Sequence, residues 1–205
     1  KIKLNAASGG GSFSLQAPSS SSNNRVITLP DIADGTLLTS QSSSADIAGT
    51  ITMVDSWVVT SSFNASGAVD ITANWAKHSD GSAMVGTIGT GMTESSGIFT
   101  FPTTGIYMVH HTMSGRADSG SRSYIGMRQY FSTNSGSSFS VRSSGYSSGS
   151  SSTDHVVGSG TVFYDVTNVS THRIKFDVET SAQCTFFGNA SNKNTGVVFI
   201  RLGDT

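Results

Sequence analysis

The sequence predicts an all-β protein built as an antiparallel β-sandwich or jelly roll, and three features of the 205-residue chain lead to that prediction. Only 12% of the residues are charged, while 11 Phe, 5 Tyr and 2 Trp are enough to line a core. Ser, Thr and Gly dominate the composition, with 23 Gly and only 3 Pro, which favours short strands joined by tight turns. No stretch carries helix-forming residues at a 3.6-residue period, so long helices are not expected.

Residues 1–48 are predicted to form a β-rich stalk or attachment segment that ends in a Ser-rich connector at 40–48. Short segments with apolar residues at every second position precede the connector, at 2–6, 13–17 and 25–29. Because these apolar side chains are few, one such chain cannot bury a core, whereas three chains wrapped around an axis can. A disordered arm is the alternative, although disordered segments rarely keep such alternation.

Residues 49–205 are predicted to form the head domain. Short strands spaced by about a dozen residues are typical of a β-sandwich or jelly roll. We expect strands at 53–59, 69–75, 97–101, 105–113, 124–132, 156–166, 173–180, 183–187 and 196–202. Two Ser- and Gly-rich segments, 134–138 and 143–153, are interpreted as exposed loops.

Two of the expected strands are apolar on both faces. In residues 106–111 neither of the two sets of alternate positions is purely polar, and residues 197–200 are apolar throughout. A sandwich strand with one solvated face should alternate between apolar and polar residues. We therefore expect the outer surface of these strands to contact another subunit of an oligomer.

The segment 96–107, Ser-Gly-Ile-Phe-Thr-Phe-Pro-Thr-Thr-Gly-Ile-Tyr, resembles the signature G-x-F-x-x-P-x-x-G-x-Y of the complement/tumour-necrosis-factor-like jelly roll. Residues 160–166 and 188–200 are similar to that family's long inner strand and closing strand. The resemblance spans residues 55–203. It implies a jelly-roll head that assembles as a homotrimer.

The N-terminal part resembles a segment of tail-fibre and other structural proteins of marine and cyanobacterial bacteriophages. The residues that carry this resemblance are 15–18, 25–31 and 34–39, and the stretch 88–93 before the jelly-roll signature is likewise similar to such phage proteins. It implies a fibre with a globular tip on the surface of a virion, attached to other virion proteins through the N-terminal segment. The chain opens at Lys1 without a Met, which we interpret as a processed or partial chain.

The family resemblance also implies a register on the three-fold axis. If the strand starts at Gly105, alternation directs every second side chain to the axis and places Tyr107 and Val109 in the core. The predicted trimer interface consists of Met108, His110, Val198 and Ile200.

The sequence predicts no catalytic residues. Residues 145–149 fit G-x-S-x-G, but a nucleophile elbow needs a strand, a sharp turn and a helix, and this segment is a Ser-rich stretch. Asp154 and His155 are adjacent, so on a strand they point to opposite sides and form no triad.

No metal, cofactor, nucleic acid or membrane insertion is expected either. His110 and His111 are neighbours on one strand and cannot share a metal, and the lone Cys184 excludes a multi-thiolate zinc site. The net charge of −1 gives no electrostatic footprint for nucleic acid. No apolar run approaches the ~20 residues of a membrane span.

Aromatic and charged residues in the expected loops are the remaining candidates for host contact. They are Arg116, Asp118, Arg122, Tyr124, Tyr146, Asp154 and His155. Aromatic side chains with polar neighbours are typical of binding loops, and solvated turns are the alternative interpretation of each residue.

Taken together, the patterns predict a non-enzymatic virion protein, a tail fibre whose trimeric receptor-binding head attaches to a host-surface glycan or protein by multivalent adhesion. A capsid head-fibre or decoration protein of the same fold is the first alternative. A depolymerase-type tailspike is the second, but it calls for β-helical repeats and a carboxylate groove that the sequence does not show. A non-viral secreted adhesin is a further alternative.

Overall fold

The computed structural model describes residues 2–5, 12–15, 51–78 and 86–205. The chain divides into two units, residues 1–39 and 40–205, and each is described by itself. In the first unit β1 (Ile2–Asn5) pairs antiparallel with β2 (Ser12–Leu15). The expected strand at 25–29 and the connector at 40–48 lie outside the described residues, so the stalk and a boundary at residue 48 stay predictions.

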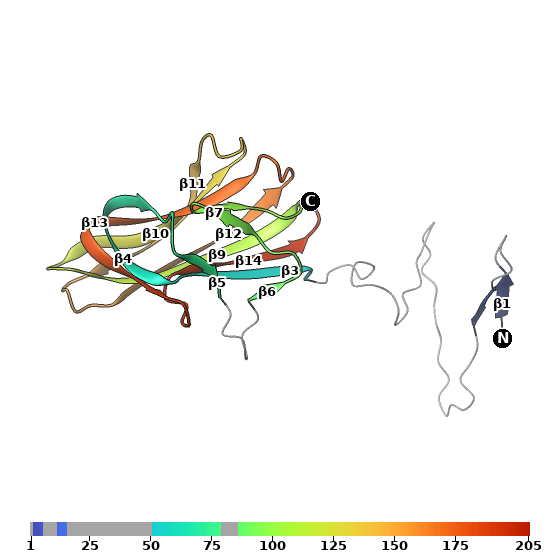
Figure 1. Cartoon of the computed structure of the whole chain (residues 1–205), viewed down its shortest axis with the longest axis horizontal. Coiled ribbons are helices and arrows are strands. Elements are labelled where there is room, and N and C mark those ends of the chain that lie inside the picture. Colours follow the sequence, from blue (N-terminus) through green and yellow to red (C-terminus); the bar gives the residue numbers. More distant parts are fainter. Residues whose placement is uncertain (1, 6–11, 16–50, 79–85) are drawn as a thin grey trace, which may run out of the picture. The chain divides into compact units, whose positions relative to one another are not determined.

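The second unit is one antiparallel sheet of twelve strands that folds over on itself (Figure 1). Its strands are β3 (Met53–Val59), β4 (Ser61–Asp70), β5 (Trp75–Lys77), β6 (Thr87–Ile88), β7 (Thr93–Ser95), β8 (Ile98–Thr100), β9 (Gly105–Ala117), β10 (Arg122–Ser132), β11 (Ser140–Gly149), β12 (Val156–Val166), β13 (Arg173–Asn189) and β14 (Gly196–Gly203). This confirms the all-β prediction. No helix in the described parts of the chain is long and apolar enough to cross a membrane.

The folded sheet forms two layers. The first layer runs β3–β14–β9–β12, with β5 and β6 paired to the outer edge of β3. The second runs β4–β13–β10–β11, with β8 also paired to β13 and β7 to β8. The layers are joined where Cys184–Phe186 of β13 pairs with Gly115–Ala117 of β9.

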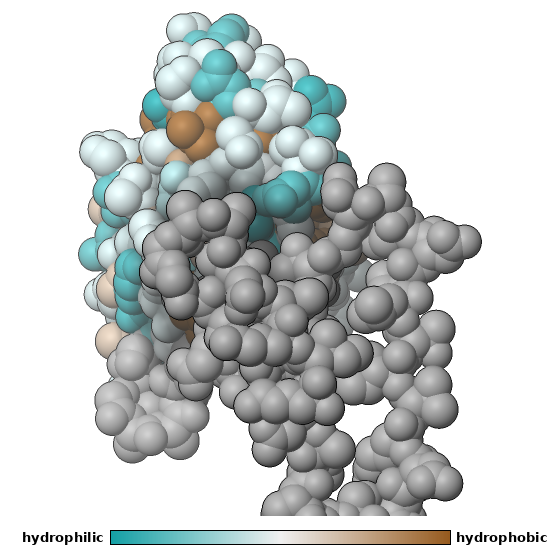
Figure 2. Space-filling model, turned by 90° about the vertical axis from the view of Figure 1, so that its right-hand side faces the viewer, coloured by the Kyte–Doolittle hydropathy of each residue, from teal (hydrophilic) through white to brown (hydrophobic). Residues whose placement is uncertain are grey.

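Aromatic side chains fill the space between the layers. Phe99 of the second layer packs against Trp57 and Phe199 of the first, each with ring centroids 5.3 Å apart. Phe131 stacks on Tyr164 across the layers at 4.6 Å. Because alternate residues of each strand point inward, these few large rings provide the core of a chain whose exposed surface is rich in Ser and Thr. On the side of the molecule that Figure 2 shows, pale and teal side chains prevail.

The turn before β8 explains one part of the family signature. Ser96 and Gly97 join β7 to β8 with φ values of 52° and 80°, as in the two-residue hairpin turns that need left-handed backbone at both positions. A Cβ added at Gly97 would overlap the Ile71 carbonyl oxygen. Glycine is therefore required here by both conformation and space.

The expected strand at 69–75 is wrong as a single element. β4 already ends at Asp70 and β5 begins at Trp75, and the chain turns between them through Asn74, whose φ is 63°. Ile71 at the start of this turn is buried in the core, and its carbonyl oxygen accepts a 2.9 Å hydrogen bond from the indole of Trp75. Ile71 therefore fills the core from a turn, whereas Val69 and Ala73 at the alternate positions are exposed.

The expected loop at 143–153 is also wrong over most of its length, because residues 140–149 form β11. This strand pairs with β10 from Arg122 opposite Gly149 to Phe131 opposite Ser140. The turn is confined to the residues between Gly149 and Val156. A further difference is that 173–180 and 183–187 belong to one strand, β13, which keeps an irregularity between Thr180 and Cys184 in its pairing with β4.

Candidate functional site

The outward face of the first layer carries a row of apolar side chains. Ile88, Val54, Ile200, Met108 and Phe163 lie on β6, β3, β14, β9 and β12, and each is directly opposite the next. Directly opposite side chains share a face and lie within contact distance. The two ends are the most exposed, Ile88 at 45% and Phe163 at 62%. We call these five residues the apolar row.

A more polar row lies beside it. Ser56, Val198, His110 and Thr161 are directly opposite one another on the same strands. His110 Nδ1 lies 2.8 Å from the Thr161 hydroxyl, and the Lys193 ammonium donates to the Ser56 hydroxyl at 3.0 Å. Burial lowers the pKa of Lys193 to about 8. The polar atoms of this row therefore find partners on the face itself.

The residues predicted for the trimer interface all lie on this face. Met108, His110, Val198 and Ile200 point outward and are half-buried. Tyr107 and Val109 point into the core and are fully buried. The strand begins at Gly105, so the alternation follows the expected register. The interface itself stays a prediction.

Sequence reasoning missed three members of the row: Val54, Ile88 and Phe163. The alternation of 53–59 and 156–166 was visible, but nothing in the sequence indicates that β3 and β12 lie on either side of β14 and β9. Only the fold shows that β3 pairs with β14 and that β12 pairs with β9.

The seven candidates for host contact gather toward one end of the sandwich. Arg122 is opposite Gly149 and Gly115 is opposite Val156, so the β9–β10 and β11–β12 turns lie at the same end. Their placement in loops needs correction because the strands extend further than expected. Arg116, Arg122, Tyr124 and Tyr146 lie on strands, whereas Asp118, Asp154 and His155 lie in the connecting segments.

Several of these candidates serve the turns themselves. Arg122 is buried rather than exposed, and its guanidinium donates to the carbonyl oxygens of Ser121 at 2.9 Å and Gln183 at 2.6 Å. The Asp154 carboxylate accepts from the hydroxyl and the amide of Ser150, which lower its pKa. These contacts hold the β9–β10 and β11–β12 turns.

The remaining candidates differ in what they contact. Asp118 accepts a 2.6 Å hydrogen bond from the Thr185 hydroxyl, and the His155 ring lies 4.9 Å from that of Phe187. Arg116 is exposed. Tyr124 and Tyr146 are brought together, with ring centroids 5.8 Å apart, on the solvent face of the second layer.

A charged network that sequence reasoning missed adjoins the two tyrosines. Arg128 on β10 binds both carboxylate oxygens of Asp177, at 2.9 and 2.5 Å, and one of Glu179 at 2.9 Å. The Tyr130 hydroxyl donates to Asp177 at 3.0 Å, and the Tyr146 hydroxyl donates to Glu179. Burial and the bond to Glu179 raise the pKa of Tyr146. The strands β10 and β13 were expected, but their pairing, which creates the network, was not predictable.

A second polar group lies inside the core. His111 Nδ1 is 2.7 Å from the Gln129 amide nitrogen, and the Tyr164 hydroxyl donates to the Gln129 carbonyl oxygen at 3.1 Å. Burial lowers the pKa of His111 to about 4, so its imidazole is neutral at neutral pH. The group is closed to solvent and links the two layers.

The G-x-S-x-G segment lies along β11, where the Ser147 hydroxyl donates to the Val157 carbonyl oxygen at 2.7 Å. Within the described ranges, no three or more His, Cys, Asp or Glu side chains are grouped to hold a metal ion.

The sequence matches no protein-family model and no curated protein. Solved structures do match. Eiger TNF from S. frugiperda is 13% identical with a TM-score of 0.55, over 76% of this chain and 96% of that one. Murine APRIL at pH 5.0 is 13% identical with a TM-score of 0.51, over 73% and 98%. The PRD1 vertex protein P5 is 17% identical with a TM-score of 0.44, over 76% and 100%. The first two confirm the jelly-roll fold.

Proposed function

We propose that this chain is a non-enzymatic structural protein of a bacteriophage virion, a tail fibre whose homotrimeric jelly-roll head attaches to the host surface. The observation that carries the proposal is the apolar row, which crosses the first layer from Ile88 to Phe163. Contiguous apolar surface of this kind marks an interaction site on a soluble domain. A second copy of the chain is the occupant, in keeping with the jelly-roll resemblance.

A closed ring is the assembly that suits this face. The row ends on β12, where the Phe163 side chain is exposed. Three copies related by a three-fold axis cover the same face in each copy and leave no surface for further addition. Such a head presents every other site three times, which converts weak contacts into avidity. Residues 1–48 then connect the head to other virion proteins.

The assembly is tested with Ile200→Asp in the full-length chain. Light scattering should report a trimer for the parent chain at micromolar concentration, and a monomer for the variant, because the trimer would bury an unpaired charge. Val141→Asp is the matched control, since Val141 is an exposed apolar residue on β11 of the other layer. A parent monomer, or a variant that stays trimeric, contradicts the assembly.

Host attachment is tested by competition. Purified parent protein added to host cells should slow the adsorption of phage particles. Ile200→Asp should need about a hundredfold more protein for the same effect, because it loses avidity. If the parent trimer does not compete at all, the capsid-decoration alternative takes the place of host attachment.

A further inference from the structure

The solvent face of the second layer carries a strip of aromatic and charged side chains along β10. Outward positions of this strand are Tyr124, Gly126, Arg128 and Tyr130, which together span about 20 Å at the usual rise of a strand. On one side β13 contributes Lys175, Asp177 and Glu179, and on the other side β11 contributes Tyr146. We call these eight residues the β10 strip.

Aromatic rings lie at both ends of the β10 strip. At one end Tyr146 crosses over Gly126, where an added Cβ would overlap its ring, and it packs nearly perpendicular to the ring of Tyr124. Both rings are accessible, with Tyr124 38% and Tyr146 44% exposed. At the other end the Lys175 ammonium lies 5.1 Å from the ring centre of Tyr130 and 5.1 Å from that of Phe139.

Ion pairs hold the middle of the strip, where carboxylates outnumber cations by one. Arg128 is held by two carboxylates, Asp177 and Glu179, and Lys175 is held by Asp70 at 2.6 Å. Two cations thus face three carboxylates, and each cation already has a carboxylate partner. The strip therefore offers no unpaired positive charge to a phosphate, a sulfate or a polyanion. It offers fixed donors and acceptors beside the two accessible rings, Tyr124 and Tyr146.

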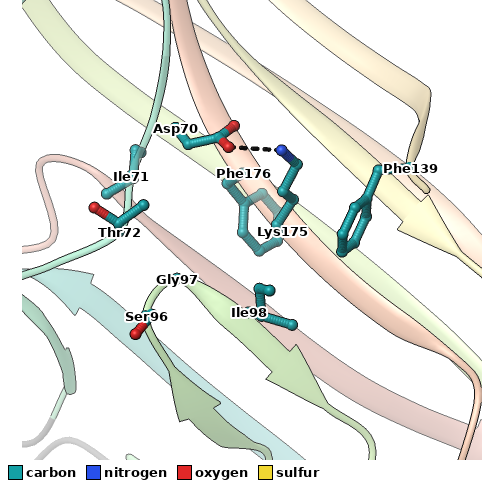
Figure 3. A pocket seen from close by; sticks show the side chains of 9 residues that line it. All are labelled: Asp70, Ile71, Thr72, Ser96, Gly97, Ile98, Phe139, Lys175 and Phe176. Carbon is teal, nitrogen blue, oxygen red and sulfur yellow. Dashed lines mark hydrogen bonds and ion pairs between the residues drawn. The ribbon is translucent and has the colours of Figure 1, made fainter. Parts of the chain in front are cut away.

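A shallow pocket continues the strip past Lys175 (Figure 3). It encloses about 100 Å³ between the ring of Phe139, the Lys175–Asp70 ion pair and the side chains of Thr72 and Ser96. Its lining repeats the chemistry of the strip, an aromatic ring beside fixed polar groups. The pocket can take the end group of a chain that lies along β10.

We propose that the β10 strip and this pocket bind a neutral oligosaccharide. A sugar presents a C–H face that packs on an aromatic ring, and hydroxyl groups that both donate and accept hydrogen bonds. Rings at the two ends with paired carboxylates and a guanidinium between them match that pattern, and the excess of one carboxylate disfavours an anionic ligand. This inference rests on the proposed host attachment and names the receptor class. It also moves the contact from the hairpin turns to a strand surface.

The test starts with labelled full-length protein on a printed array of neutral, uronic-acid and sulfated oligosaccharides. The neutral oligosaccharide that gives the strongest signal is then titrated by calorimetry. Tyr146→Ala should weaken its binding about tenfold, equivalent to about 1.4 kcal/mol, because the stacking ring is removed. Tyr146→Phe keeps the ring and should stay within about threefold of the parent protein. Arg116→Ala, an exposed residue off the strip, should bind as the parent does.

If Tyr146→Ala does not fold, as judged by its thermal transition, Tyr124→Ala replaces it because it removes the other ring of the pair. Three results would overturn the proposal: no neutral oligosaccharide binds, only sulfated ones bind, or Arg116→Ala weakens binding while the tyrosine variants do not. The array needs no cells. A trimer that blocks particle adsorption but binds no sugar therefore refutes this inference and leaves host attachment standing.

Discussion

His111 lies between the two layers without solvent contact, and its Nε2 atom has no hydrogen-bond partner among the described residues. Its pKa is about 4 in the folded chain, against 6.5 in the unfolded one. Between these values the unfolded chain binds more protons, so acid favours unfolding. The free energy of unfolding should fall by about 3 kcal/mol as the pH drops from above 6.5 to below 4.

Urea unfolding of the parent chain at about pH 7.5 and about pH 4.5 captures most of this loss. His111→Gln removes the titrating group and should show a clearly smaller decrease between the two conditions. His155→Gln serves as the control, because His155 is exposed and should leave the parent's pH dependence in place. Equal decreases in parent and His111→Gln would rule out His111 as the source.

Asp55 is a buried charge with a structural role. It accepts from the indole of Trp57 at 2.8 Å, the hydroxyl of Thr87 at 2.8 Å and the amide of Met92 at 2.6 Å, and Lys77 lies 3.2 Å away. Asp55→Ala leaves buried donors unpaired and should lower the free energy of unfolding by about 3 kcal/mol or more.

Lys77→Ala provides the comparison, because the Lys77 side chain is 43% exposed. Its loss should cost clearly less than the loss of Asp55, because the three other donors still hold the buried carboxylate. Both values come from urea unfolding at neutral pH. If the two variants lose the same stability, Asp55 acts mainly through Lys77 and the interpretation of the other three bonds is wrong.

At the scale of elements, β11 and β12 are held unusually close. A Cβ on Gly145 would overlap the backbone of Ser159, whereas one on Gly149 would meet its neighbours at 3.6 Å or more. Gly145→Ala must push the two strands apart and should lower the free energy of unfolding by about 2 kcal/mol. Gly149→Ala on the same strand should stay within about 0.5 kcal/mol. Thermal or urea unfolding of both variants tests the difference, and two equal values would contradict it.

The same close approach explains where sequence reasoning failed. β3 and β12 alternate strongly, and their predicted bounds, 53–59 and 156–166, agree with the structure. β4 and β11 are rich in Ser and Gly and carry few apolar residues, so periodicity does not predict them. They form strands because their backbones pair with β13 and β10, respectively. This pairing depends on the neighbouring strands and not on the local sequence. Gly and Ser in β11 indicate a tight strand contact here, although the same residues are typical of loops.

For the candidate site, the sequence predicts which face of a strand a side chain occupies, but it does not predict which strands lie side by side. Alternation from Gly105 was enough to place Met108 and His110 on the outward face. The apolar row and the β10 strip each need three or more strands side by side, and their order is set by the jelly-roll topology. Tyr124 and Tyr146 were selected as aromatic loop residues, and the structure brings them together for another reason, the register of β10 and β11.

At the scale of the whole molecule, the two proposed surfaces lie on different layers. The apolar row faces outward from β3, β14, β9 and β12, and the β10 strip faces outward from β13, β10 and β11. Self-association through the first layer therefore leaves the second layer accessible in every copy. A trimer with this arrangement presents three sugar-binding strips, so a modest affinity per strip is enough for stable attachment.

If the head folds as a trimer held together by the apolar row, its stability must depend on protein concentration. Unfolding of a trimer to three chains makes the free energy of unfolding rise by about 0.9 kcal/mol per chain for each tenfold increase in concentration. The midpoint of thermal unfolding should therefore rise when the parent chain is concentrated. Ile200→Asp should unfold at a lower midpoint that does not depend on concentration, while Val141→Asp should follow the parent. A parent midpoint that is independent of concentration would show that each head is stable alone, and the apolar row would then need another partner.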